Sequence, residues 1–132
     1  MLARLMQYPE KIEAYSTISY DKLLSSTIIK YILENYKDAK MNELSGLLHL
    51  PDYKICKLIK KTMNTTFTKL VQKVRLERAG LLLETTNLNI NTIMQEVGYE
   101  NISYFYKIFK DQYTITPQEY RKSNKNKDNI AY

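Results

Sequence analysis

Apolar residues recur at three- and four-residue steps along most of this chain, and that spacing is typical of helices with one buried face. The clearest stripe consists of Leu24, Ile28, Tyr31, Ile32 and Tyr36. The same periodicity predicts helices over residues 24–37, 41–48, 52–61, 67–83, 90–97, 102–110 and from Pro117 onward. The chain is therefore expected to be all-α, with about seven helices.

Two blocks of the sequence, about fifty residues apart, share one pattern. The first block reads Leu44-Ser45-x-x-x-His49 and the second reads Ile93-Met94-x-x-x-Gly98. Each block continues into a helix in which apolar positions and lysines are interleaved: Ile55, Lys57, Ile59 and Lys60 in the first, and Phe105, Lys107, Phe109 and Lys110 in the second. Internal repetition of this kind indicates a duplicated helix-turn-helix.

The segment between the two blocks is predicted to be one long helix that separates them. Residues 67–83 contain no breaker except Gly80, and at 1.5 Å per residue they form a rod of roughly 25 Å. The last residues carry few apolar side chains to bury, which favours disorder. We therefore expect a linker or upstream remnant over 1–25, a first helix-turn-helix subdomain over 26–65, a linker helix over 66–84, a second subdomain over 85–122 and a disordered tail over 123–132.

Turn and capping residues agree with these boundaries. Asn89 and Asn101 precede predicted helices, where an asparagine side chain can accept from freed backbone N–H groups. Asn64 and Gly98 follow predicted helices and suit the positive backbone angles of a helix end. Thr116-Pro117-Gln118-Glu119 combines a capping box with proline at the first helical position, the strongest start signal in the chain.

Composition excludes several classes of protein. The single cysteine, Cys56, rules out a disulfide framework, and no run of about 18 apolar residues exists to span a bilayer. His49 has no second histidine and no orienting group, so neither zinc binding nor a catalytic triad is indicated. We therefore expect a cytoplasmic protein without membrane attachment, metal or cofactor, and not an enzyme.

The net charge of +6 is unevenly distributed. Residues 37–79 carry ten basic and four acidic side chains, whereas residues 80–120 carry two basic and five acidic ones. A lysine-rich solvated surface accounts for such a bias in many proteins. The sharper interpretation is a face that binds a polyanion, centred on the first repeat.

A longer motif carries a family resemblance. The second block reads Ile93-x-x-x-Val97-Gly98-Tyr99-x-x-x-Ser103-Tyr104-Phe105-x-x-x-Phe109-Lys110, followed by Thr116-Pro117-x-x-Tyr120-Arg121. Over about residues 28–122 the chain resembles the DNA-binding domain of the AraC/XylS family of bacterial transcription regulators. Met94 stands where that family usually has alanine, and Pro51 stands where it usually has a serine cap. These departures affect local geometry and leave the expected fold unchanged.

The resemblance implies sequence-specific binding of double-stranded DNA, with two recognition helices in successive major grooves. It also implies RNA polymerase as a partner, and a separate sensing and dimerising domain upstream in a longer protein. By the same resemblance, the residues that face bases are Tyr53, Cys56, Lys57, Ile102, Ser103, Tyr106 and Lys107. Candidates for phosphate neutralisation are Lys54, Lys60, Lys61, Lys69 and Lys73.

Alternatives remain at this point for several residues and for the function. Arg75 suits a structural ion pair as well as a phosphate contact, and Tyr104, Phe105 and Phe109 suit the core better than a contact surface. A second hypothesis for the whole chain is a helical interaction module, an adaptor or anti-activator that has lost DNA recognition. Met94, Pro51 and the acidic second block motivate it.

Overall fold

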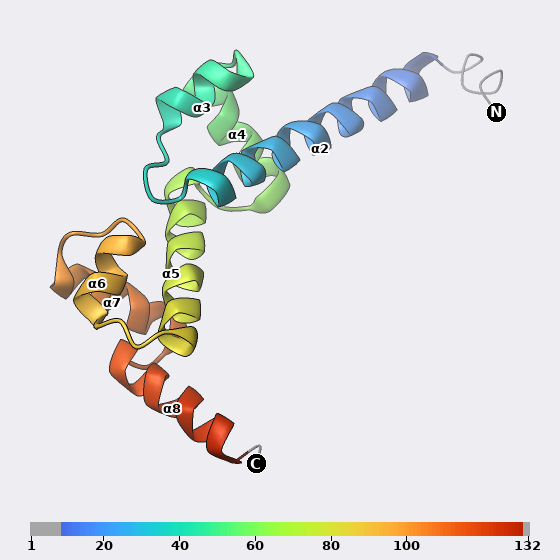
Figure 1. The fold of residues 1–132 in the computed structure, drawn as a ribbon. Coiled ribbons are helices and arrows are strands. Elements are labelled where there is room, and N and C mark those ends of the chain that lie inside the picture. Colours follow the sequence, from blue (N-terminus) through green and yellow to red (C-terminus); the bar gives the residue numbers. More distant parts are fainter. Residues whose placement is uncertain (1–8, 131–132) are drawn as a thin grey trace. The chain divides into compact units, whose positions relative to one another are not determined.

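In the computed structural model of the chain, residues 9–130 are described, with side chains from 19 to 125. This part of the chain contains seven helices and no strand (Figure 1): α2 (Pro9–Asn35), α3 (Met41–Leu48), α4 (Asp52–Met63), α5 (Phe67–Thr85), α6 (Ile90–Glu96), α7 (Ile102–Tyr113) and α8 (Pro117–Ile130). The predicted all-α class is confirmed. None of these helices is both long and apolar enough to cross a lipid bilayer.

The helices pack as two compact units, each built around one helix-turn-helix. The first unit contains α2 up to Glu34 and the segment Ala39–Lys69, so that α3 and α4 form its helix-turn-helix. The second unit contains Asn35–Asp38 and the chain from Leu70 onward, so that α6 and α7 form the other. Most of α5, predicted as a separate linker helix, therefore belongs to the second unit.

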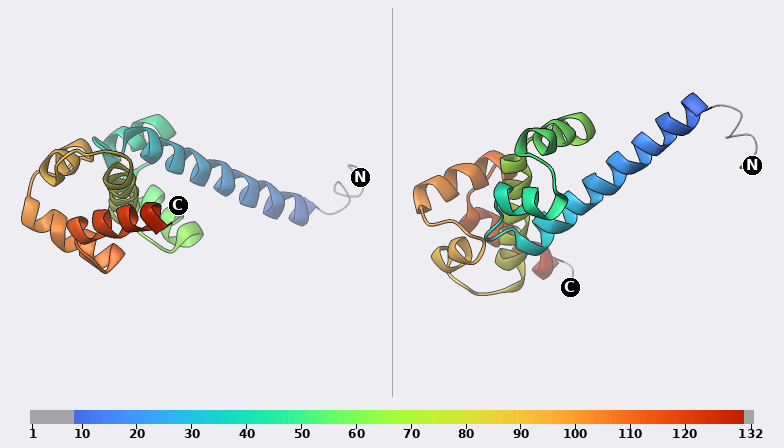
Figure 2. Two further views of the ribbon diagram at one scale, coloured as in Figure 1. Left: turned by 60° about the horizontal axis from the view of Figure 1, so that its bottom comes forward. Right: turned by 90° about the horizontal axis from the view of Figure 1, so that it is seen from above.

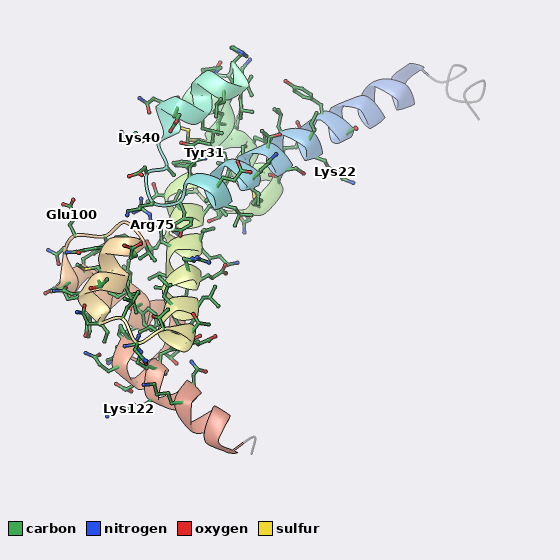
Figure 3. All side chains as sticks on the ribbon, viewed as in Figure 1. Lys22, Tyr31, Lys40, Arg75, Glu100 and Lys122 are labelled. Carbon is green, nitrogen blue, oxygen red and sulfur yellow. The ribbon has the colours of Figure 1, made fainter. Side chains whose placement is uncertain are left out.

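The core of the first unit joins α2, α3 and α4. Its buried side chains are Ile28, Tyr31, Ile32, Leu44, Ile55, Leu58 and Ile59. The hydroxyl of Tyr31 accepts from the backbone N–H of Lys40 at 3.0 Å and lies 2.7 Å from a carboxylate oxygen of Glu43 (Figure 3). These bonds satisfy the polar end of a buried tyrosine and fix the start of α3.

The core of the second unit explains why α5 is part of it. Leu76, Ala79 and Leu83 of α5 pack with buried residues of α6 and α7, namely Ile93, Met94, Val97, Phe105, Ile108 and Phe109. In Figures 1 and 2, α6 and α7 lie beside the C-terminal part of α5. A helix with this much buried surface is a core element of its unit, because burial of apolar area is the dominant stabilising term.

An aromatic cluster closes this core against α8. The ring of Phe109 lies 4.5 Å from that of Tyr113 and 5.6 Å from that of Tyr120, measured between centroids. The Tyr113 hydroxyl donates to the carbonyl of Leu76 at 3.0 Å, and the Tyr120 hydroxyl donates to the Glu84 carboxylate. Burial, reinforced by that carboxylate, raises the pKa of Tyr120 to about 12. The phenol is therefore neutral at any physiological pH.

The capping predictions can be checked bond by bond. The side chain of Asn89 accepts a hydrogen bond from the backbone N–H of Thr92 at 2.8 Å, and that of Asn101 accepts one from the N–H of Tyr104 at 2.9 Å. Both predicted caps are confirmed. Asn64 has φ 52° and Gly98 has φ 102°, so the predicted positive-φ turns are confirmed. The capping box at Thr116 forms in part: its hydroxyl accepts from the Glu119 N–H at 3.2 Å, while the Glu119 carboxylate accepts from that same hydroxyl.

Two helices run further than the sequence predicted. Helix α2 begins at Pro9, fifteen residues before the predicted start at Leu24, and the expected linker over 9–25 is helical in this structure. Helix α8 continues to Ile130 through the expected disordered tail. Both extensions lack internal glycine and proline, so nothing in the sequence ends the helix earlier. The remaining parts of these two segments, 1–8 and 131–132, lie outside the described residues.

Candidate nucleic-acid interface

Helix α4 presents a basic face to solvent because its apolar residues all lie on the opposite side. Ile55, Leu58 and Ile59 are buried, at the three- and four-residue spacing that defines one helical face. Asp52 lies in the first turn of α4, and Lys60 and Lys61 lie in its last turn. Charges of these signs at these ends are favourable to the helix dipole, so the sequence can hold a lysine-rich helix without destabilising it.

The six site residues predicted on α4 are all exposed, and the helix brings them together: Tyr53, Lys54, Cys56, Lys57, Lys60 and Lys61. Tyr53, at the N-terminal end of the face, is 66% exposed. A tyrosine this open makes no contribution to the core. Its position beside a row of cations resembles the combination of flat apolar surface and charge that nucleic-acid-binding faces use.

Lys61 differs from its neighbours because it has a carboxylate partner. Its ammonium lies 3.0 Å from an oxygen of Asp21 on α2, and this is the one ion pair among the side chains described between residues 19 and 125. The Lys61 side chain is 69% exposed, so the pair contributes little stability. Lys54, Lys57 and Lys60 have no such partner in that part of the chain, which leaves their charge available to an external anion.

The phosphate candidates on α5 are divided between the two units. Lys69 and Lys73 are both exposed, but Lys69 belongs to the first unit and Lys73 to the second. The hydroxyl of Thr66 accepts from the Lys69 N–H at 3.2 Å, as expected for the residue that caps α5. The structure therefore does not gather all five predicted phosphate contacts on one element.

Helix α7 is the corresponding helix of the second unit, and its outward face is less basic. Ile102, Ser103 and Lys107 are exposed as predicted. Tyr106, expected to face outward with them, is half-buried: its ring lies edge-on to Phe105, and its hydroxyl accepts from the side-chain amide of Gln118 on α8. Its side chain is therefore less open than its three neighbours on this face, because Gln118 of α8 packs beside it, and its base contact stays a prediction.

Tyr104 also differs from expectation. The sequence favoured the core for this residue, but its side chain is 46% exposed, whereas Phe105 and Phe109 are fully buried as predicted. The Tyr104 ring lies 6.0 Å from the ring of Tyr99 in an edge-to-face arrangement. It adds an exposed aromatic surface at the N-terminal end of α7.

Arg75 is a residue whose role the sequence left open, and the structure assigns it. Its Nε donates to the carbonyl of Tyr36 at 2.6 Å and its Nη2 to the carbonyl of Lys37 at 3.0 Å. Nη1 lies 3.5 Å from the carbonyl of Gly98, and the guanidinium lies 5.0 Å above the Tyr99 ring. Arg75 therefore binds backbone, and it fastens the segment after α2 to the turn between α6 and α7 (Figure 3).

Comparison with known proteins identifies the family. The family model of an AraC-type helix-turn-helix domain matches residues 44–123, more than half of the chain. The chain belongs to this family. The resemblance inferred from the motif around Gly98 is thereby confirmed, and so is the all-α fold, with seven helices among the described residues.

Relatives of known name agree with this assignment. The chain is 35% identical over 100 residues to the transcriptional activator PerA of Escherichia coli O127:H6. The aligned region covers 75% of this chain and 36% of PerA. It is 29% identical over 127 residues to the xylose operon regulatory protein of Escherichia coli K12, and this aligned region covers 93% of this chain and 32% of that protein. The chain thus spans about a third of the length of these curated relatives.

A solved structure matches the fold directly. The C-terminal domain of AraT, a response regulator from Geobacillus stearothermophilus, superposes with a TM-score of 0.70 at 27% identity. The match covers 76% of this chain and 84% of that domain. The two chains therefore share one fold over about three quarters of this chain.

Proposed function

We propose that this chain binds double-stranded DNA with sequence specificity and thereby regulates transcription. The observation that carries the proposal is the exposed face of α4, on which Lys54, Lys57 and Lys60 stand without a carboxylate partner among the described side chains. Membership of the AraC-type family supports it, because the named relatives are transcription regulators. A row of unpaired cations on a helix is the electrostatic pattern that DNA-binding helices use.

In the proposed mode of binding, α4 and α7 enter successive major grooves of one duplex. The major groove admits an α-helix, and lysine pairs best with the O6 and N7 acceptors of guanine. Lys57 and Lys107 stand at equivalent positions of the two repeats and are both exposed. We assign them the leading base contacts, with Tyr53 beside Lys57 as a partner for a thymine methyl group or a stacked base.

The two helices are expected to contribute unequally to affinity. Residues 37–79, which include α4, carry ten basic and four acidic side chains, whereas residues 80–120, which include α7, carry two and five. Phosphate contacts supply most of the salt-dependent affinity of DNA-binding proteins. Helix α4 should therefore supply most of that affinity, and α7 should contribute mainly to discrimination between sites.

Replacing Lys57 with alanine is expected to weaken binding to a cognate site by about 1–3 kcal/mol, because a bidentate or charged base contact is lost. The site is obtained by selecting bound duplexes from a random pool, which also reveals whether the footprint spans two adjacent grooves. Fluorescence anisotropy then compares Lys57→Ala, Lys107→Ala and the control Lys30→Ala, an exposed lysine of α2. A larger loss for Lys107→Ala than for Lys57→Ala contradicts the assigned order.

The burial of Met94 bears on the adaptor hypothesis. Met94, which replaces the usual alanine of the family, is one of the departures that motivate that hypothesis. Its side chain is 2% exposed and lies within the core of the second unit. A flexible thioether fills irregular space well, so the larger residue is compatible with a packed motif.

We also propose partners that lie beyond this chain. RNA polymerase is the expected partner of a transcriptional activator, and the relative PerA is named as a transcriptional activator. Because the chain spans about a third of its curated relatives, we propose that it works beside a sensing and dimerising domain supplied by the rest of a longer protein. Co-purification of the full gene product with polymerase tests the first of these proposals.

A further inference from the structure

A groove on the first unit runs between α2 and α4, and we call it the α2–α4 groove. Its volume is about 820 Å³. Its lining includes the apolar side chains of Leu24, Leu50 and Leu58 and the lysines Lys54, Lys57 and Lys60. Pockets that hold small molecules commonly measure about 300–1,000 Å³ and combine apolar walls with a few charged groups. The groove has both properties.

The groove exists because one stripe of α4 turns toward α2. Lys54, Lys57 and Lys61 recur at steps of three and four residues on one side of α4, and the buried Leu58 borders that side. Tyr20 of α2 also lines the groove and is 53% exposed. Tyr20 lies in the part of α2 that precedes the start at Leu24 predicted from the sequence. The early start of α2 therefore supplies this part of the lining.

The charge of the lining selects the kind of ligand. Asp21 is the one acidic residue among the described residues of the lining, and its carboxylate is already bound to Lys61 at 3.0 Å. Beside the apolar part of the lining, three lysines remain to which no described side chain supplies a carboxylate. A phosphate backbone satisfies the lysines but leaves the leucine side chains in contact with water. A molecule with an apolar body and one anionic group satisfies both parts of the lining.

We propose that the α2–α4 groove binds a small amphiphilic anion, an aromatic or aliphatic carboxylate or sulfonate, and that this ligand and DNA exclude each other. The exclusion rests on the proposed function, because Lys54, Lys57 and Lys60 are also the residues assigned to DNA. An anion seated on them removes the charge that the duplex needs. The DNA-reading unit thus carries its own site for a negative effector.

The first part of the test measures ligand binding directly on the full chain. The probe is anilinonaphthalene sulfonate, whose fluorescence rises in apolar surroundings and whose sulfonate supplies the anion. Saturable binding is expected, and Tyr20→Ala and Lys54→Ala should each weaken it about fivefold, the loss of one aromatic or charged contact. Lys22→Ala and Tyr104→Ala remove a lysine and a tyrosine outside the groove and should leave the affinity unchanged. Equal effects of all four variants overturn the site.

The second part measures competition with a fluorescent duplex. A saturating concentration of the dye should raise the apparent Kd for DNA at least about fivefold. Tyr20→Ala, which removes no assigned DNA contact, should keep its DNA affinity without dye and lose sensitivity to it. Simultaneous binding of dye and duplex overturns the proposal. If the chain binds dye through Tyr20 and Lys54 but binds no duplex, the proposed function fails while the ligand class of the groove is supported.

Discussion

Replacing Gly98 with alanine is expected to destabilise the second unit by about 3 kcal/mol. Gly98 has φ 102°, in the region that side chains rarely adopt, and the strain of such a backbone costs about 1–3 kcal/mol. A Cβ at this position would lie 2.8 Å from the carbonyl oxygen of Lys37 and 3.2 Å from the guanidinium carbon of Arg75. The oxygen belongs to the backbone and cannot rotate away, so overpacking adds about 1–3 kcal/mol.

Urea unfolding followed by circular dichroism measures this loss, with Gly46→Ala as the matched control. Gly46 lies inside α3 and is exposed, and a Cβ added to it would meet no atom within 4 Å. Alanine there should stabilise the first unit by about 0.5–1 kcal/mol, because glycine is a poor helix former. Equal effects of the two substitutions would show that the Gly98 turn is not packed against Lys37.

Replacing Arg75 with alanine is expected to cost about 2–3 kcal/mol of stability in the same unit. The guanidinium donates to the carbonyls of Tyr36 and Lys37 and lies close to that of Gly98. Hydrogen bonds from a charged group contribute about 1.5–3 kcal/mol each when buried, and solvent reduces this for a half-exposed side chain. Loss of the contact with the Tyr99 ring adds a smaller amount.

Two further variants separate geometry from charge at this position. Arg75→Lys keeps the charge but loses the planar fork that reaches several carbonyls, so we expect it to recover less than half of the lost stability. Arg78→Ala removes an exposed arginine three residues further along α5 and should change stability by less than about 0.5 kcal/mol. The account is wrong if Arg75→Lys unfolds at the same urea concentration as the wild-type chain.

Local chemistry explains which features the sequence could predict. The helices follow from apolar spacing, as in the buried stripe of Ile55, Leu58 and Ile59. The caps at Asn89 and Asn101 depend on neighbours three residues away. Contacts of this range are present in any short window of sequence, so the pattern determines them before tertiary packing does.

Features that depend on residues far apart in the chain could not be predicted from the sequence. Arg75 meets Tyr36 and Gly98 only after the chain folds, 39 and 23 residues away. The partial burial of Tyr106 was not predicted, because its partner on α8, Gln118, is twelve residues further on. The α2–α4 groove was also missed, since Tyr20 lies before the predicted start of α2. Each of these required knowledge of which elements pack together.

The salt dependence of binding to a random duplex tests the central claim most directly. Lysines on α4 that neutralise phosphates should release counterions, so the logarithm of the association constant should fall linearly with the logarithm of salt concentration. Lys60→Ala should reduce that slope by about 1, whereas Lys30→Ala should leave it unchanged. Weak binding at every salt concentration, with a flat slope, contradicts DNA binding by α4 and favours the adaptor hypothesis.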